Sequence, residues 1–185
     1  IGTINPLGHN VAEYWEALAA GVSGVDSIKS FDCSNTKTKI AAEIKDYRSE
    51  DYFERKEARK LDAFTQYALI SADEAIKDAR LEECELDKKR VGVIWGAGIG
   101  GINAMYEEVA AFSTSESQTP RFSPFLILKM LPNMAAGHIS LKYGYRGPGF
   151  STVSACSSST HSIVSAVDQI RLGRADVMVT GGSEG

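Results

Sequence analysis

The fold of this 185-residue chain is decided by the stretch Arg90-Val91-Gly92-Val93-Ile94-Trp95. The run is short and apolar, and glycines follow it at once, which is the pattern of a strand buried on both faces. Buried strands of this kind occur in parallel sheets whose two faces are covered by helices. We therefore expect residues 90–95 to form the central strand of an α/β fold.

Helices and strands alternate on both sides of this strand. Before it, apolar residues recur at three- and four-residue steps from Leu61 to Ala79, which predicts a long helix with a mainly small-residue face. After it, the patterns predict a helix at 102–112, a polar loop at 113–120, an apolar segment at 124–131, a helix at 132–142, a strand at 150–155, a helix at 156–172 and a strand at 175–180. This alternation predicts a parallel sheet with helices on its faces.

The N-terminal third is less regular. Asn10 and Glu13 form a capping-box-like start for a short amphipathic helix that stops at Gly21. Between residues 22 and 52 no period is sustained, so we expect irregular connections with one short strand near 40–44.

The composition is that of a globular protein with a core. Apolar residues make up 43% of the chain and charged residues 24%, and the net charge of −4 indicates neither a nucleic-acid partner nor an anionic membrane. No stretch approaches the roughly 18 apolar residues of a membrane span. Three cysteines without a CxxC pair or a histidine cluster favour a reducing compartment and no metal site. We expect a cytoplasmic (bacterial) or organellar protein.

Both ends of the sequence are expected to lie inside a longer protein. The chain has no initiator methionine, and it ends on a small-residue turn directly after a predicted strand. We therefore expect residues 1–185 to be a single, incomplete domain, truncated at both ends.

One candidate site is the glycine-rich stretch 96–101, which satisfies the pattern GxGxxG after a strand and before a helix. A dinucleotide site of this type also needs an acidic residue about twenty positions further on, at the end of a second strand, and here that region is a polar loop. The alternative is that the glycines permit a sharp bend or a close approach of the backbone. We expect this loop to shape a pocket.

The second candidate site is the Ser/Thr-rich stretch 151–161, in which a predicted strand runs into a predicted helix with Cys156 at the junction. A helix N-terminus offers unpaired N–H groups and a positive dipole, which favour a thiolate and hold an oxyanion. A cysteine can equally be a small buried hydrophobe, and the local pattern leaves both interpretations open. His161 is more than one turn further along the same helix, so we expect it to be structural, and Cys33 and Cys84 lack such a junction.

Around Cys156 and along the whole chain, the sequence resembles the β-ketoacyl-acyl-carrier-protein synthases of the elongating class called synthase II, in the thiolase-like superfamily. The resemblance rests on blocks in family order, namely 6–8, Trp15, Gly21, 59–62, 98–101, 123–125, 132–137, 146–148, 155–159 and 175–178. It implies a thiolase-like layered fold, with this chain as the first half of a duplicated αβαβα architecture.

The resemblance also implies a chemistry. Cys156 takes the position of the nucleophile that accepts an acyl chain from acyl-loaded carrier protein, and malonyl-loaded carrier protein is then decarboxylated and condensed with it. No metal or redox cofactor is expected. The family's two histidines, its lysine, its gating phenylalanine and one oxyanion donor belong to the second half of the fold. We therefore expect residues 1–185 alone not to catalyse condensation.

Further roles follow from the resemblance. Ile99 matches a position that lines the acyl pocket, and Gly98, Gly100 and Gly101 allow close approach there. Leu126 and Ile127 match positions near a homodimer interface, where one subunit helps to close the acyl pocket of the other, so they are expected to take part in substrate binding. Ordinary core packing is the alternative for Ile99, Leu126 and Ile127. Four cations match a region that contacts the acidic carrier protein, with a solvated helix start as the alternative; they are Arg55, Lys56, Arg59 and Lys60.

Two other functions remain open at this stage. One is a polyketide-type ketosynthase; Cys156 argues against the related chain-length partner, which lacks the nucleophile. The other is a carrier-protein-binding module without chemistry.

Overall fold

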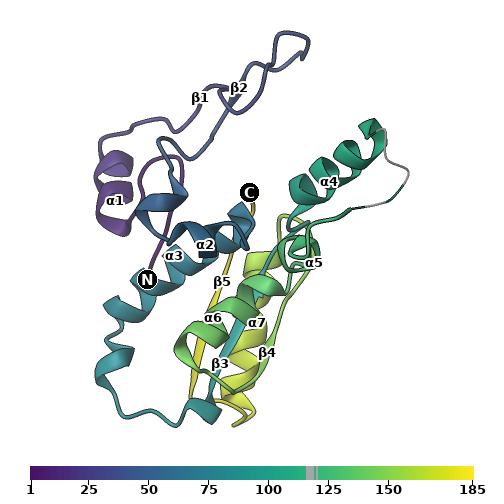
Figure 1. Ribbon diagram of the computed structural model, residues 1–185. Coiled ribbons are helices and arrows are strands. Elements are labelled where there is room, and N and C mark those ends of the chain that lie inside the picture. The colour runs from purple at the N-terminus through teal and green to yellow at the C-terminus, as the bar shows by residue number, and fades with distance from the viewer. Residues whose placement is uncertain (116–118, 120) are drawn as a thin grey trace.

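The computed structural model describes residues 1–115, 119 and 121–185 (Figure 1). Half of the polar loop predicted at 113–120, namely positions 116–118 and 120, therefore lies outside the described residues. Its first two positions belong to the preceding helix, because the hydroxyls of Ser113 and Thr114 donate hydrogen bonds back to the carbonyl of Ala110, at 2.9 and 3.0 Å.

The central sheet has three parallel strands in the order β4-β3-β5. They are β3 (Val91–Gly96), β4 (Gly149–Phe150) and β5 (Val177–Gly182). Every residue of β3 is buried, which confirms the prediction of a central strand. Its pairing with β5 runs without a break from Val91↔Val177 to Gly96↔Gly182.

Helices cover both faces of the sheet (Figure 1). On one face lie α3 (Ala63–Asp78) and α6 (Met134–Tyr143), and on the other lies α7 (Ser158–Arg171). Successive side chains of a strand point to opposite faces. Val93 and Trp95 accordingly join the apolar core with α3 and α6, whereas Gly96 faces the first turn of α7. The predicted layered architecture is confirmed.

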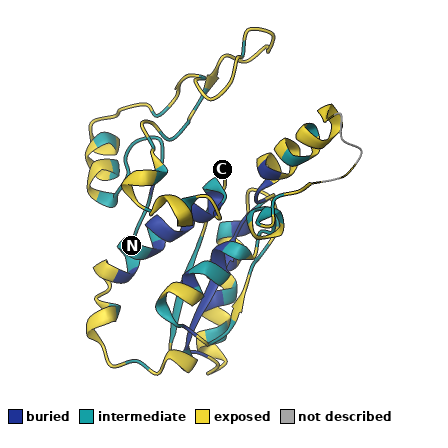
Figure 2. Cartoon of the chain, viewed as in Figure 1, coloured by how far each residue is buried: buried dark blue, intermediate teal, exposed yellow. Residues whose placement is uncertain are grey.

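The remaining elements surround this unit. They are α1 (Val11–Ala19), β1 (Asp26–Ser27), β2 (Ile40–Ala41), η1 (Ser49–Asp51), α2 (Arg55–Ala58), η2 (Leu81–Glu83), η3 (Lys88–Arg90), α4 (Ile102–Thr114) and α5 (Leu126–Met130). The predicted N-cap of α1 is confirmed, since Asn10 Oδ1 accepts the Glu13 N–H at 2.9 Å, whereas the Glu13 carboxylate accepts the N–H of His9 and not that of Asn10. The antiparallel β1–β2 pair and α4 project from the layers and are largely exposed (Figure 2).

Several predicted boundaries are wrong by a few residues, and three of the elements concerned adjoin the candidate sites. The strand predicted at 150–155 is only two residues long and exposed, because the hydroxyl-bearing residues after it bond outside the ladder: Ser151 Oγ donates to the Trp95 carbonyl, and Thr152 Oγ1 donates to Ser158. As a result α7 begins at Ser158 rather than at Cys156. The last strand is shifted by two residues and runs to Gly182, so that it matches β3 along its whole length.

None of the helices within 1–115 and 121–185 is long and apolar enough to cross a membrane. Over the same part of the chain, no cluster of three or more histidine, cysteine or acidic side chains is placed to hold a metal ion.

His138 makes stability depend on pH. It lies half-buried on α6, and its Nε2 atom has no hydrogen-bond partner among the described residues. Burial lowers the pKa of His138 below its ordinary value of 6.5, an effect that outweighs the opposing charge of Glu57. The unfolded chain therefore binds a proton at a higher pH than the folded chain, and stability falls as the pH drops below about 6.5.

We expect His138→Gln, which cannot be protonated, to flatten this dependence. The measurement is the urea midpoint of unfolding between pH 5 and 8, with the exposed His161→Gln as the matched control. If the urea midpoint fell equally steeply below pH 6.5 in both variants, His138 would not be the group that makes stability depend on pH.

Candidate active site at Cys156

Cys156 lies exposed on a sharp turn between the sheet and α7. The residue before it, Ala155, has a φ of 50°, in the left-handed region that non-glycine residues rarely adopt. The buried Ser158 holds this turn, because its Oγ accepts the Ser154 N–H at 2.9 Å and donates to the Ala155 carbonyl at 2.7 Å. The strained backbone is thus fixed by a side chain of the following helix.

The relation of the thiol to the helix differs from the expectation. The N-cap of α7 is Ser157, so Cys156 precedes the helix instead of starting it. The N–H groups of Ser157 and Ser158 donate to the carbonyls of Ser154 and Ala155, at 3.1 and 3.0 Å. These two donors are therefore occupied within the turn and are not free to hold an oxyanion.

A pocket of about 440 Å³ opens in front of this turn. It is bounded by the segments that follow the carboxyl ends of β3 and β5 and by the first turn of α7. In open α/β sheets, ligands usually bind at the carboxyl ends of the strands. Its lining comprises Gly96, Ala97, Gly98, Ile99, Ala155, Cys156, Ser158, Ser159, Gly182, Ser183 and Glu184. The structure thus brings together the two candidate stretches that the sequence analysis considered separately.

The glycine stretch shapes this pocket, as predicted. Three successive N–H groups donate to the carboxylate of Glu184: those of Gly98 at 2.5 Å, Ile99 at 3.1 Å and Gly100 at 2.9 Å. Successive N–H groups of this kind form an anion-binding concavity. The groups that a dinucleotide phosphate would need are therefore already bound to a side chain of the same protein.

The other side of the glycine stretch packs on α5. A Cβ atom at Gly101 would stand 2.2 Å from the Lys129 carbonyl oxygen, which explains the need for glycine there. Of the two α5 positions considered for an interface, Leu126 is half-buried and Ile127 is 55% exposed. Neither lines the pocket with Cys156.

The four candidate carrier-binding cations lie together on α2 and the turn after it. Arg55, Lys56, Arg59 and Lys60 are all exposed. Within the described residues they form no salt bridge, and Lys60 Nζ stands 6.0 Å from the ring centre of Phe125. This cluster is outside the pocket, and its positive charge is not neutralised by an ion pair in the part of the chain that the structure describes.

The histidines do not reach the thiol. His161 Nδ1 is hydrogen-bonded to Ser154 Oγ at 2.6 Å, in keeping with the expectation of a satisfied structural histidine. His9 is bonded to the Tyr52 hydroxyl and the Lys45 carbonyl. Neither histidine lines the pocket, nor do Cys33 and Cys84.

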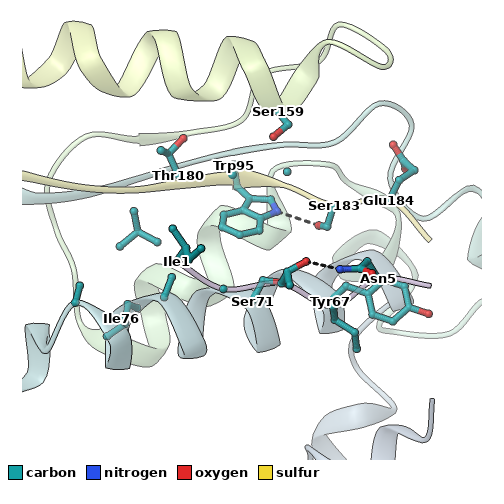
Figure 3. A pocket seen from close by; sticks show the side chains of 18 of the residues that line it. Ile1, Asn5, Tyr67, Ser71, Ile76, Trp95, Ser159, Thr180, Ser183 and Glu184 are labelled. Atoms are coloured by element: carbon teal, nitrogen blue, oxygen red, sulfur yellow. Dashed lines mark hydrogen bonds between the residues drawn. The ribbon is translucent and has the colours of Figure 1, made fainter. Parts of the chain in front are cut away.

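A larger hollow of about 740 Å³ lies between the N-terminal segment, α3 and β5 (Figure 3). It is crossed by a hydrogen-bonded chain in which Trp95 Nε1 donates to Ser183 Oγ at 2.9 Å and Ser183 Oγ donates to the Phe64 carbonyl at 2.7 Å. The hollow contains no cysteine or histidine. The smaller pocket, which contains the thiol, is therefore the better candidate for chemistry.

Sequence reasoning missed the part that Glu184 plays in this site. The signal that would have found it is the parallel pairing of the two glycine-ended strands, 91–96 and 177–182. Because Gly96 pairs with Gly182, the residues two positions further on, Gly98 and Glu184, come to lie beside each other.

Comparisons with known proteins identify the family of this chain. A family model described as "Beta-ketoacyl synthase, N-terminal domain" matches residues 1–185. The chain is 40% identical over 184 residues to the 3-oxoacyl-[acyl-carrier-protein] synthase 2 of Staphylococcus aureus, and the match covers all of this chain and 45% of that protein. The chain thus spans less than half the length of this curated relative.

Two solved structures have the same fold. A beta-ketoacyl synthase from Burkholderia phymatum STM815 superimposes with a TM-score of 0.83 at 26% identity, over 99% of this chain and 45% of that one. A ketosynthase solved with its type II polyketide acyl-carrier protein superimposes with a TM-score of 0.78 at 24% identity, over 100% of this chain and 48% of that one. The second likeness, at this identity, concerns the fold alone.

The left-handed backbone conformation of Ala155 is expected to lower the free energy of unfolding of the protein. We expect Ala155→Gly to leave the free energy of unfolding unchanged or to raise it by up to about 1 kcal/mol, because glycine adopts positive φ freely. Ala155→Val is expected to lower it by about 1–3 kcal/mol.

Urea denaturation of both variants measures this effect, with Ala111→Val as control. Ala111 is exposed in a right-handed helix, where valine costs at most about 0.7 kcal/mol. An equal loss of stability at the two positions would argue against a strained turn.

Proposed function

Because this chain belongs to the beta-ketoacyl synthase family, whose N-terminal domain it matches along its whole length, we propose that the complete protein is a β-ketoacyl-acyl-carrier-protein synthase of fatty-acid elongation. The observation that carries the proposal is the exposed Cys156, held on a strained turn and opening into a pocket. An exposed thiol on a strained turn that neighbouring hydrogen bonds hold in place is suited to nucleophilic attack.

The proposed reaction has two stages. In the first, the Cys156 thiol gives up its proton and the resulting thiolate attacks the carbonyl of the acyl thioester on the carrier protein. The bond between that carbonyl and the carrier's sulfur breaks, the carrier's thiolate leaves and takes up the proton, and the acyl chain remains on Cys156. In the second, malonyl-carrier protein loses CO₂, and its α-carbon attacks the acyl-cysteine carbonyl. A carbon–carbon bond forms, the Cys156 thiolate is released, and the β-ketoacyl chain remains on the carrier.

The residues of this chain supply the first stage. Cys156 provides the nucleophile, and Ile99 with Gly98 forms the nearby pocket wall that limits the acyl chain; Gly100 and Gly101 let the loop pack closely on α5. The groups that assist decarboxylation are expected in the other half of the family fold. On this proposal residues 1–185 are part of a larger catalytic unit.

A polyketide-type ketosynthase is the second candidate, favoured by the structural likeness to a ketosynthase of that kind. That likeness is at 24% identity, whereas the curated 3-oxoacyl-[acyl-carrier-protein] synthase 2 is 40% identical. A binding module without chemistry would have no use for a thiol in a pocket. We therefore favour fatty-acid elongation.

The first test concerns the nucleophile. In the complete natural protein, Cys156→Ala is expected to lower acyl transfer from acyl-carrier protein by at least about a thousandfold, because the acyl acceptor is removed. Peptide mass spectrometry would locate the acyl adduct. Cys33→Ala and Cys84→Ala are matched controls that should retain activity, and an adduct on either of those residues would contradict the proposal.

Carrier protein is proposed to dock on the exposed cluster Arg55, Lys56, Arg59 and Lys60. The structural relative solved in complex with its acyl-carrier protein supports a partner of this class for the fold. Acidic partners are steered by exposed cations that lack internal ion pairs, as these do among the described residues.

We further propose a homodimer that covers α4 and α5. Of the residues of α4, only Ala104 is buried, and several large apolar side chains are exposed on these two helices; they are Ile102, Met105, Tyr106, Val109, Phe112, Ile127 and Leu128. An apolar surface of this kind is typical of an interaction site. Leu126 and Ile127 would lie at or beside this interface.

The second test separates docking from catalysis. Lys60→Glu and Arg59→Glu are each expected to raise the KM for acyl-carrier protein by about two- to tenfold, since an exposed ion pair is worth up to about 1 kcal/mol and reversal adds repulsion. The KM for a small acyl thioester should not change. Lys89→Glu, at the opposite end of β3, is the control. An equal rise in KM for both substrates would contradict the docking role and would favour the alternative that the cluster is an ordinary solvated helix start.

A further inference from the structure

The carboxylate of Glu184 occupies a position set by the sheet. The last pair of the β3–β5 ladder is Gly96↔Gly182, and two residues beyond it Glu184 meets the loop that leaves β3. Its Oε2 accepts the N–H groups of Gly98 and Ile99, and its Oε1 accepts that of Gly100. One side chain thus bonds three successive donors that are 84 to 86 residues away in the sequence.

Glu184 bonds the loop from within the pocket lining, and among the described residues no other group accepts a hydrogen bond from the N–H groups of Gly98, Ile99 and Gly100. Gly98 and Ile99 both line the pocket in front of Cys156, and Ile99 is 61% exposed. A Cβ atom at Gly98 would lie 2.8 Å from Glu184 Oε2, so the absence of a side chain at Gly98 is what permits the carboxylate to approach. On the opposite side, the Gly101 N–H donates to the Met130 carbonyl at 3.2 Å. The loop is therefore held between α5 and Glu184.

We propose that Glu184 is a positioning residue that holds Ile99 against the space in front of Cys156 and so sets which acyl chain lengths the pocket accepts. The acyl part of this inference rests on the proposed function. The positioning part depends only on the contacts of Glu184. The three N–H dipoles point into one concavity and repel one another, and the carboxylate of Glu184 stabilises this loop conformation by accepting a hydrogen bond from each.

A carboxylate bound in such a concavity can be replaced by a free carboxylate. In Glu184→Ala the three N–H groups remain and are exposed to solvent, and acetate in the buffer has the same chemistry as the missing side chain. Rescue by acetate is a signature that a merely structural loss of packing would not give. Glu184→Gln keeps the shape of the side chain and one acceptor oxygen, so residues 98–100 should remain partly ordered in this variant.

The experiment uses the complete natural protein with Glu184→Ala, Glu184→Gln and, as matched control, the exposed Glu16→Ala on α1. The first readout is hydrogen–deuterium exchange at the amides of residues 98–100. The second is alkylation of Cys156 by N-alkyl iodoacetamides of increasing chain length, which probes the pocket without carrier protein. The third is acyl transfer from carrier proteins loaded with short and long chains. Each is measured in acetate and in chloride at equal ionic strength.

We expect exchange at residues 98–100 to become about tenfold faster in Glu184→Ala, because charge-assisted hydrogen bonds are lost. The ratio of long-chain to short-chain alkylation should change several-fold, acyl transfer should change in the same direction, and acetate should restore all three. Glu184→Gln should fall between wild type and Glu184→Ala, and Glu16→Ala should match wild type.

Unchanged exchange at residues 98–100 would overturn the positioning role. Faster exchange with an unchanged alkylation ratio, or no response to acetate, would reduce Glu184 to a structural contact and overturn the control of chain length. If wild-type Cys156 is alkylated but never acylated, the proposed function fails while the exchange and alkylation results still decide the role of Glu184.

Discussion

The parallel pairing of β3 with β5 is the constraint on which the rest of the structure depends. These six-residue strands match end to end, so both finish at the same level, at Gly96 and Gly182. The glycine loop and Glu184 leave from that level, and the first turn of α7 packs directly on the two glycines. A shift of the register would separate Glu184 from Gly98 and would move the turn that carries Cys156.

Much of this fold is predictable from local pattern. The stretch 90–95 indicates a buried central strand because burial on both faces requires an uninterrupted apolar run, and the helix at 61–79 follows from its periodicity. The pocket is partly predictable too, since a glycine loop and a cysteine turn follow strands of one parallel sheet. Sequence alone could not place Glu184, because its role arises from strand register rather than from any local motif.

The two errors around Cys156, in the strand predicted at 150–155 and in the helix predicted at 156–172, have a common physical cause. Between Ser151 and Ser162 the side chains compete with the backbone for hydrogen bonds, as hydroxyl-bearing residues commonly do. Thr152 Oγ1 is within 2.7 Å of Ser162 Oγ, and Ser158 Oγ bonds on both sides of Ala155. The pattern of apolar residues does not reveal such bonds. The prediction from this pattern therefore made the strand too long and placed the start of the helix two residues too early.

The contact between the two glycines and α7 restricts how this site can change over evolutionary time. A Cβ atom at Gly96 would stand 2.4 Å from the Ser158 backbone, and one at Gly182 would stand 2.6 Å from Ser159 Cβ. Either substitution would push the helix away from the sheet and carry the thiol with it. A gene that drifts at these positions would lose the geometry of the turn that carries Cys156 while the cysteine codon stayed intact, so the presence of the cysteine alone does not show that this turn is preserved.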